Sequence, residues 1–235
     1  PEAVRLSDAL AAGRRATLER VPLAHDDIAF LQYTGGTTGV AKGAVLLHRN
    51  IVANLLQARA WVGPFLSSER EVIITPLPLY HIFSLTANCL TFMTLGAENI
   101  LIPNPRDIPG FIKEMGKYKF TVMTGVNTLF NALVNHPEFA KLDFSSFRIA
   151  LGGGMAVQEA VAVKWKEVTG CTLVEAYGLT ETSPAATMNP LDLPAYNGTI
   201  GLPISSTEVT LRDDAGKDVA LGLPGEICIR GPQVM

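Results

Sequence analysis

The sequence has 235 residues, of which 48% are apolar and 17% are charged, and its formal net charge is −3. This length and apolar content suffice for a buried core, which excludes a disordered chain and a miniprotein held together by disulfides. The slightly acidic balance gives no electrostatic basis for binding a nucleic-acid backbone, so we expect no nucleic-acid partner.

Two features of the sequence bear on its compartment and its borders. Cys89, Cys171 and Cys228 lie far apart, with no CxxC pair and no histidine at metal-ligand spacing, and are expected to be reduced thiols in the cytoplasm. The chain starts at Pro1 with a charged amphipathic stretch instead of a signal peptide, and we expect it to be a piece of a longer protein. Prolines interrupt the uncharged run 72–97, which predicts a strand, a turn and a core helix instead of a membrane span.

The first predicted elements lead into a glycine-rich loop. Residues 6–20 are a helical candidate that ends before Pro22, and residues 28–32 form a short apolar strand. Residues 33–43 then read YTGGTTGVAKG, and the next helix is predicted to begin near His48. The loop is therefore expected to connect a strand directly to a helix.

Beyond this loop, short apolar runs alternate with amphipathic stretches, the pattern of strand and helix units around a mostly parallel sheet. The predicted helices are 82–95, 108–115 with Asp107 as N-cap, 126–133 and 157–168 closed by Gly170; the predicted strands are 120–123, 147–151 and 172–176. After Pro184 the helical periodicity disappears, and segments such as 208–212 and 226–230 alternate like strands. The expected fold is thus an α/β sheet flanked by helices, followed by a small antiparallel sheet or partial barrel.

The loop 33–43 carries groups suited to polyphosphate. Its glycines let backbone N–H groups turn toward an anion, its threonines add hydroxyl donors, and Lys42 supplies a positive charge. It is not a Walker A loop, because Lys42 is followed by Gly43 instead of Ser or Thr. A flexible turn is the ordinary alternative, but so many glycines are costly backbone freedom for a mere connection.

Several segments resemble one enzyme superfamily. The loop YTGGTTGVAKG resembles the signature phosphate loop of the acyl-adenylate-forming, or AMP-binding, enzymes, and VEAYGLTE at 174–181 resembles their second signature. PLYH at 78–81, GGGM at 152–155 and GEICIRGPQVM at 225–235 match in the same order. With NPRDIPG and TGVNTLFNAL between them, the chain from about residue 28 onward is similar to the bacterial long-chain fatty acid CoA ligases.

The resemblance implies a reaction and a domain plan. ATP activates a long-chain fatty acid to acyl-AMP, with release of pyrophosphate, and the CoA thiol then takes the acyl group; Mg²⁺ accompanies the ATP. Residues 1–27 would lead in from a truncated subdomain, 28–190 would form the AMP-binding subdomain, and 191–235 would begin a truncated small β subdomain. The C-terminal catalytic domain of such ligases lies outside this sequence, so the piece alone is expected to bind nucleotide and to be catalytically incomplete.

The resemblance also assigns roles to residues. Thr180 reaches the α-phosphate, Glu181 ligates Mg²⁺, and His81 positions the carboxylate that is activated. Tyr177 lays its ring against adenine. The expected nucleotide-binding residues are Thr34, Gly35, Gly36, Thr37, Thr38, Gly39 and Lys42 for the β- and γ-phosphates, and Gly152, Gly153, Gly154, Glu175, Ala176, Tyr177 and Gly178 around the base.

Two other readings of the same motifs stay open. An adenylation domain that loads an acyl or aminoacyl group onto a carrier protein shares both signatures, and a non-catalytic module could bind nucleotide without reaction. The expected location is the cytoplasm, with peripheral contact at the inner face of the membrane left open. The sequence does not set the acyl chain length, the oligomeric state or the presence of a tunnel gate.

Overall fold

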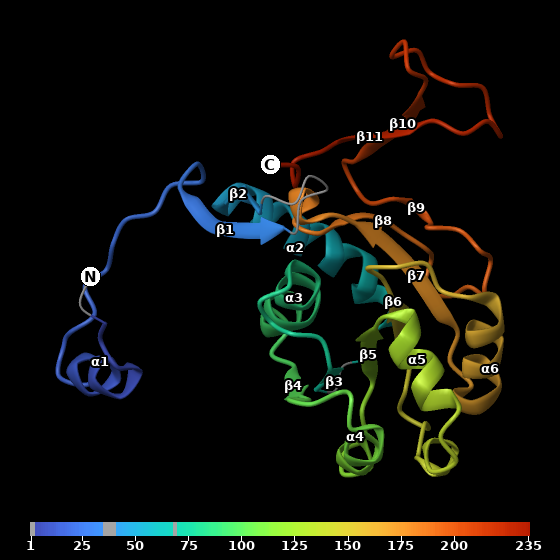
Figure 1. Cartoon of the computed structure of the whole chain (residues 1–235), viewed down its shortest axis with the longest axis horizontal. Helices are drawn as coiled ribbons and strands as arrows, with labels where there is room; N and C mark the ends of the chain where they lie inside the picture. The colour runs from blue at the N-terminus through green and yellow to red at the C-terminus, as the bar shows by residue number, and fades with distance from the viewer. Residues whose placement is uncertain (1–2, 35–40, 68–69) are drawn as a thin grey trace.

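The computed structural model describes residues 3–34, 41–67 and 70–235, and a seven-stranded sheet lies at its centre (Figure 1). The strand order is β4-β3-β5-β6-β7-β8-β9, in which the first five strands are parallel and β8 and β9 are antiparallel. The strands are β3 (Val72–Thr75), β4 (Glu98–Leu101), β5 (Val122–Gly125), β6 (Ile149–Gly152), β7 (Leu173–Gly178), β8 (Ala185–Met188) and β9 (Leu202–Pro203). This sheet confirms the predicted α/β class.

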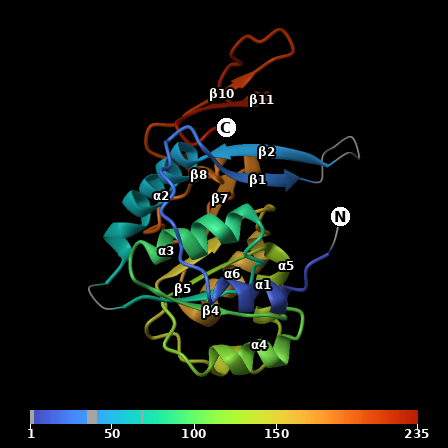
Figure 2. The same ribbon diagram turned by 90° about the vertical axis from the view of Figure 1, so that its left-hand side faces the viewer.

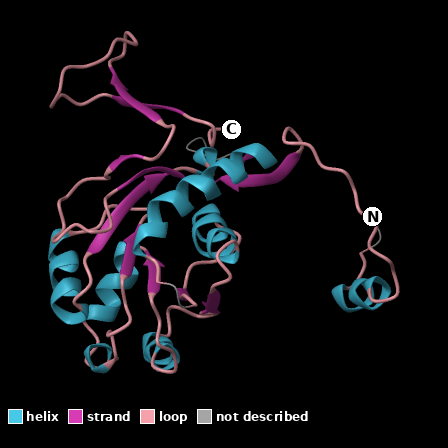
Figure 3. Cartoon of the chain, turned by 180° about the vertical axis from the view of Figure 1, so that it is seen from behind, coloured by secondary structure: helices cyan, strands magenta, loops and turns pink. Residues whose placement is uncertain are grey.

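Successive side chains of a strand point to opposite faces of the sheet, and the parallel strands are buried on both faces. Ile73, Val122 and Ile149 pack with residues of α2 and α3 on one face. Their neighbours Ile74, Met123 and Ala150 pack with α4, α5 and α6 on the other. The helices other than α1 cover the sheet as two outer layers, as Figure 3 shows from behind.

The helices have these bounds: α1 (Leu6–Gly13), α2 (His48–Val62), α3 (Thr91–Met93), α4 (Ile108–Met115), α5 (Asn127–Val134) and α6 (Glu159–Thr169). A π-helical segment, Ser84–Leu90, leads directly into α3, and short 3₁₀ turns occupy Gly63–Phe65, Phe139–Lys141 and Thr180–Thr182. The run 72–97 thus forms β3, a turn and a helical segment, as predicted. Within the described ranges, no helix is long and apolar enough to cross a membrane.

Two antiparallel ribbons lie outside the main sheet. β1 (Ile28–Thr34) pairs with β2 (Lys42–Leu47), and β10 (Glu208–Arg212) pairs with β11 (Glu226–Arg230). Figure 2 shows the second ribbon projecting beyond the body of the molecule, next to the C-terminal residues. α1 lies apart from the sheet, and none of its residues is buried (Figure 1).

Several predicted elements are confirmed, and others shift. The segments 208–212 and 226–230 are the strands β10 and β11. Asp107 caps α4 by accepting a hydrogen bond from the Gly110 N–H at 3.1 Å, and Gly170 ends α6 with a φ of +73°. The expectation of a loop leading straight into a helix is wrong, because residues 42–47 pair with β1 as a strand before α2 begins. The first helix ends at Gly13 and not at residue 20, and β4 was not predicted.

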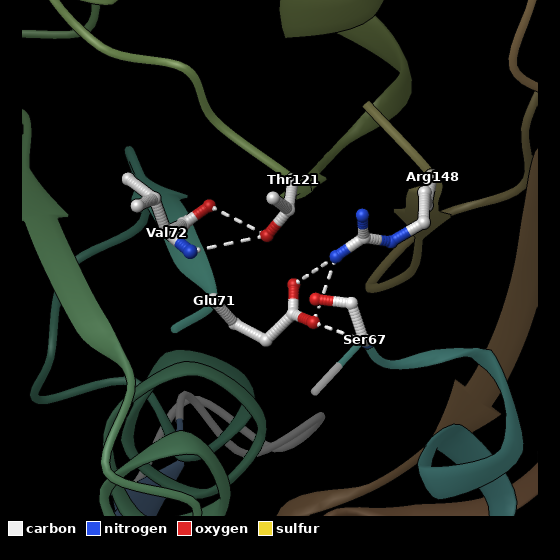
Figure 4. Close-up of polar contacts among 5 residues, drawn as sticks. All are labelled: Ser67, Glu71, Val72, Thr121 and Arg148. Atoms are coloured by element: carbon white, nitrogen blue, oxygen red, sulfur yellow. Dashed lines mark hydrogen bonds and ion pairs between the residues drawn. The ribbon is translucent and has the colours of Figure 1, made fainter. Parts of the chain in front are cut away.

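A polar cluster ties the amino ends of three neighbouring strands together (Figure 4). Glu71, Thr121 and Arg148 directly precede β3, β5 and β6. One terminal nitrogen of the Arg148 guanidinium donates to both carboxylate oxygens of Glu71, at 2.7 Å each, and the Ser67 N–H donates to Oε1 at 2.7 Å. The Thr121 hydroxyl bridges the N–H and C=O of Val72 at 3.1 and 3.2 Å. This cluster fixes the end of the sheet opposite to the cavity described next.

Candidate active site

A cavity of about 240 Å³ opens at the carboxyl ends of the parallel strands, where ligands bind in open α/β sheets. The loops after β3, β6 and β7 form its walls together with α2 and the start of β8. Seven of the predicted site residues line it: His81, Gly153, Gly154, Ala176, Tyr177, Gly178 and Thr180. Segments that are far apart in the sequence therefore meet in one place.

The predicted phosphate loop belongs to the hairpin β1–β2. Thr34 and Lys42 are paired across the hairpin, and the Thr34 hydroxyl donates to the Lys42 carbonyl at 3.5 Å. Gly35, Gly36, Thr37, Thr38 and Gly39 lie outside the described residues. The Gln32 side chain donates to the Tyr80 carbonyl at 2.7 Å, next to His81, and β2 contacts the turn Thr180–Thr182. The hairpin that carries the loop is thus fixed beside the cavity, with an exposed Lys42 at its end.

Gly152 at the end of β6 and Gly153 directly after it are required by close packing. A Cβ atom on Gly152 would lie 2.6 Å from Val157 Cγ2, and one on Gly153 would lie 3.1 Å from the Phe83 ring. Gly154 has a φ of +75°, a conformation that side chains with a Cβ rarely adopt. Gly153 and Gly154 line the cavity, whereas Gly152 lies just behind them.

The turn after β7 is locked by a close backbone approach. Gly178 packs so tightly that a Cβ would fall 1.8 Å from the Pro184 carbonyl oxygen, and the Leu179 N–H donates to that oxygen at 3.1 Å. Thr180 faces the cavity, and Glu181 is half-buried next to it, outside the lining. The Glu181 carbonyl accepts from the Met235 N–H at 3.0 Å. The turn is therefore held on both sides.

His81 stands at the start of the helical segment after β3. Its Nδ1 accepts a hydrogen bond from the Phe83 N–H at 3.2 Å, so the neutral imidazole carries its proton on Nε2. Ser84 fixes the preceding turn through a 2.8 Å hydrogen bond to the Leu77 carbonyl. His81 is exposed at the cavity wall, where its Nε2–H is free of the helix cap and suited to donate to an anionic oxygen.

Glu175 is placed behind the cavity and not in its lining. Its side chain is buried, and Oε1 accepts from the Val157 N–H at 2.7 Å. The Tyr196 hydroxyl donates to the Val157 carbonyl at 2.6 Å. Burial first, and then the neighbouring Glu175, raise the pKa of Tyr196 to about 12, which keeps the phenol a donor at ordinary pH. The Glu175 and Tyr196 side chains thus bind the N–H and the carbonyl of Val157, and this fixes the backbone that follows the glycine loop.

Sequence reasoning missed part of the lining. Leu151 and Met188 supply apolar wall, and Asn54 of α2 supplies an amide. Phe83 of the predicted helix 82–95 also lines the cavity, whereas none of the described lining residues comes from α5. Asn54 carried no sequence signal, since polar residues on a helix ordinarily face water.

The side chains present fit a Mg²⁺ ion held mainly by phosphate. Within residues 3–34, 41–67 and 70–235, no three His, Cys, Asp or Glu side chains come together as a metal cluster. Mg²⁺ in nucleotide sites commonly takes one or two carboxylates and fills its shell with phosphate oxygens and water. Glu181, half-buried beside the cavity-lining Thr180, can provide one such carboxylate.

Comparison with known proteins adds independent information. The family model described as "AMP-binding enzyme" matches residues 2–235. The long-chain-fatty-acid–CoA ligases of Yersinia pestis and Escherichia coli O157:H7 are 58% and 56% identical over 235 residues, which is 100% of this chain and 42% of each relative. The crystal structure of ATP-bound MatB from Rhodopseudomonas palustris matches with a TM-score of 0.82 and 30% identity, over 97% of this chain and 44% of that one. The chain thus spans less than half the length of each of these three proteins.

Proposed function

This chain belongs to the family of AMP-binding enzymes, and we propose that it forms the ATP-binding part of a longer ligase that joins a long-chain fatty acid to CoA. One observation carries the proposal: the cavity brings together the residues of three separate signature segments at the carboxyl ends of the sheet. The relatives from Yersinia pestis and Escherichia coli O157:H7, which match over all 235 residues, are both long-chain-fatty-acid–CoA ligases.

The proposed reaction has two steps. A fatty acid carboxylate oxygen attacks the α-phosphorus of ATP, the bond to the β-phosphate oxygen breaks, and pyrophosphate leaves. The CoA thiol then gives up its proton and attacks the acyl carbonyl of the acyl-AMP, and AMP leaves. Both steps depend on holding the reacting groups in line and on neutralising developing negative charge.

The residues of the cavity suit these tasks. Tyr177 and the backbone of Gly152–Gly154 would hold the adenine, with Glu175 clamping the loop from behind. Thr180 would donate to the α-phosphate, and the hairpin that carries Lys42 would hold the β- and γ-phosphates. His81 would donate its Nε2–H to the fatty acid carboxylate. When bound, Mg²⁺ would neutralise phosphate charge, with Glu181 as its protein ligand.

The proposal extends to the organisation of the whole enzyme. Residues 28–190 would be its AMP-binding subdomain, residues 1–27 would lead in from a preceding subdomain, and residues 191–235 would begin a small β subdomain. The enzyme would work in the cytoplasm, with peripheral contact at the inner face of the membrane giving access to fatty acids.

The test is an assay of the whole ligase with ATP, Mg²⁺, a long-chain fatty acid and CoA. We expect AMP and acyl-CoA to form in equal amounts. Glu181→Gln keeps the side-chain shape but loses the charge, and we expect it to lower the adenylation rate by about tenfold to a thousandfold. The matched control is Glu138→Gln, a carboxylate that makes an exposed surface ion pair with Lys141. Pyrophosphate and acyl-AMP without acyl-CoA would point instead to a carrier-protein acceptor, and no pyrophosphate release at all would overturn the proposal.

A further inference from the structure

One face of α2 carries amides where an apolar stripe is expected. Asn50, Asn54 and Gln57 are only 1%, 1% and 6% exposed, and their spacing of four and three places them in one row on the helix. A buried amide costs free energy unless its donors and acceptors are satisfied. The contacts of this row therefore indicate what it holds in place.

The central amide of the row acts as a strand partner for the start of β8. Asn54 Oδ1 accepts from the Ala185 N–H at 3.1 Å, and its Nδ2 donates to the Ala185 carbonyl at 3.0 Å. Asn54 also lines the cavity. A single side chain thus joins the cavity wall to the backbone that follows the turn Thr180–Thr182.

Gln57 extends the row to the C-terminal segment of the chain. Its Nε2 donates to the Ser205 carbonyl at 2.6 Å and to Gln233 Oε1 at 3.2 Å. Gln233 is fully buried, and its own Nε2 donates to Thr207 Oγ1 at 2.8 Å and to the Ala185 carbonyl at 3.3 Å. The side-chain amides of Asn50, Asn54, Gln57 and Gln233 are connected by hydrogen bonds through the start of β8 and the C-terminal segment. We call these four side chains the amide network.

The backbone of the C-terminal segment that the amide network holds contacts the turn that carries Thr180 and Glu181. The Ser183 hydroxyl donates to the Gln233 carbonyl at 2.9 Å, and the Met235 N–H donates to the Glu181 carbonyl at 3.0 Å. From the other side, Asn50 Nδ2 donates to the carbonyls on both sides of Gln233, those of Pro232 and Val234, at 3.0 and 2.8 Å. The segment 232–235 is thus fixed between α2 and this turn.

We propose that the amide network is the positioning device of the ATP site, with Gln233 as its central residue. It sets the turn Thr180–Thr182 relative to the cavity wall formed by α2, and so aims Thr180 and Glu181 at the α-phosphate and its Mg²⁺. These targets rest on the proposed function; the positioning of the turn does not. Directional, mutually satisfied hydrogen bonds select one arrangement, whereas apolar contacts between the same elements tolerate several.

The test separates positioning from stability. Gln233→Met keeps the length of the side chain and removes its donor and acceptor, and Gln57→Met/Gln233→Met removes both partners, which restores much of the stability lost by leaving one partner unpaired. Leu133→Ala, in the fully buried core of α5 far from the network, serves as a control for destabilisation alone. Two readouts are taken on the whole ligase: hydrogen exchange of residues 179–185, and steady-state kinetics.

We expect exchange of the Ala185 N–H and its neighbours to accelerate in both network variants and to stay as in the wild type in Leu133→Ala. The kcat/KM for ATP should fall by about tenfold to a hundredfold, through a higher KM for ATP and a lower kcat. The KM for the fatty acid should stay within about twofold of the wild type. The double variant should regain thermal stability without regaining these ATP parameters. Unchanged exchange in 179–185, or full recovery of the ATP parameters in the double variant, would overturn the inference. A wild-type enzyme without ATP turnover would instead contradict the proposed function, while the exchange readout would still decide whether the network positions the turn.

Discussion

Replacing Arg148 by methionine should destabilise the fold and leave the cavity unchanged. Glu71 is 4% exposed, and it accepts two hydrogen bonds from the Arg148 guanidinium and one from the Ser67 N–H (Figure 4). Arg148→Met keeps the apolar stem of the side chain and leaves the Glu71 carboxylate buried without its cation. The cluster lies at the amino ends of the strands, and the cavity lies at their carboxyl ends.

The magnitude follows from the exposure of the two partners. Removing one partner of a fully buried ion pair costs about 3–5 kcal/mol. The Arg148 side chain is 36% exposed, so water can partly replace it, and we expect a loss of about 2–3 kcal/mol in the free energy of unfolding. The Tm should fall by several degrees accordingly.

The pH dependence gives a second signature. Burial would raise the pKa of Glu71, but the Thr121 hydroxyl, the Ser67 N–H and the Arg148 charge together lower it below its ordinary value of 4.5. The unfolded state therefore binds more protons in this window, and the stabilisation is present above pH 4.5 and lost as the pH falls through the lowered pKa. Arg148→Met should flatten this decline.

Urea unfolding from pH 3 to pH 7, with ATP binding measured by calorimetry at pH 7, tests both points. We expect the loss of stability at pH 7 and an ATP affinity within about twofold of the wild type. The free energy of unfolding should also fall less steeply with decreasing pH below pH 4.5 than in the wild type. A variant as stable as the wild type, or one that loses ATP binding while it remains folded, would refute the reasoning.

Three further changes address the cavity and its supports. Gly153→Ala places a Cβ 3.1 Å from the Phe83 ring, and we expect about tenfold weaker ATP binding by calorimetry with the fold retained; equal affinity would mean that this loop does not line the base. Lys42→Ala should weaken Mg-ATP binding in low salt more than in high salt, and an affinity that is unchanged at both salt concentrations would remove Lys42 from the phosphate site. Tyr196→Phe removes the donor to the Val157 carbonyl and should cost about 0.5–1.5 kcal/mol in urea unfolding. Because the folded wild type holds the Tyr196 proton up to a pKa of about 12, against 10 when unfolded, its stability should fall from pH 10 upward, and an equal decline in the phenylalanine variant would contradict this assignment.

Local sequence patterns predicted most of the regular structure. The alternation in 208–212 and 226–230 fixes two ribbon strands, since only one face of each is apolar, and Asp107 and Gly170 mark helix ends through local hydrogen bonding and backbone conformation. The strand β2 was missed because its Lys42 and Gly43 read as the end of a loop. Its identity comes from pairing with β1, which is a tertiary contact.

The cavity was predicted in part, and its support was not. Motifs place Tyr177 and Thr180 at strand ends, because the carboxyl ends of parallel strands meet at one edge of a sheet. In the sequence, Asn54 and Gln57 resemble the solvent-exposed face of a helix. Only the packing of α2 against the C-terminal segment shows that they are buried. The side chain of Glu175 likewise acts on Val157, a partner that no spacing rule identifies.

The most direct test of the central claim is a crystal structure of the whole ligase with a non-hydrolysable acyl-AMP analogue. The account predicts the adenine between Tyr177 and the backbone of Gly152–Gly154, with the phosphate-like group within hydrogen-bond distance of Thr180 and the acyl carbonyl on the side of His81. An analogue bound elsewhere, or one that enters this cavity with its adenine turned away from Tyr177 and its phosphate-like group away from Thr180, would contradict it.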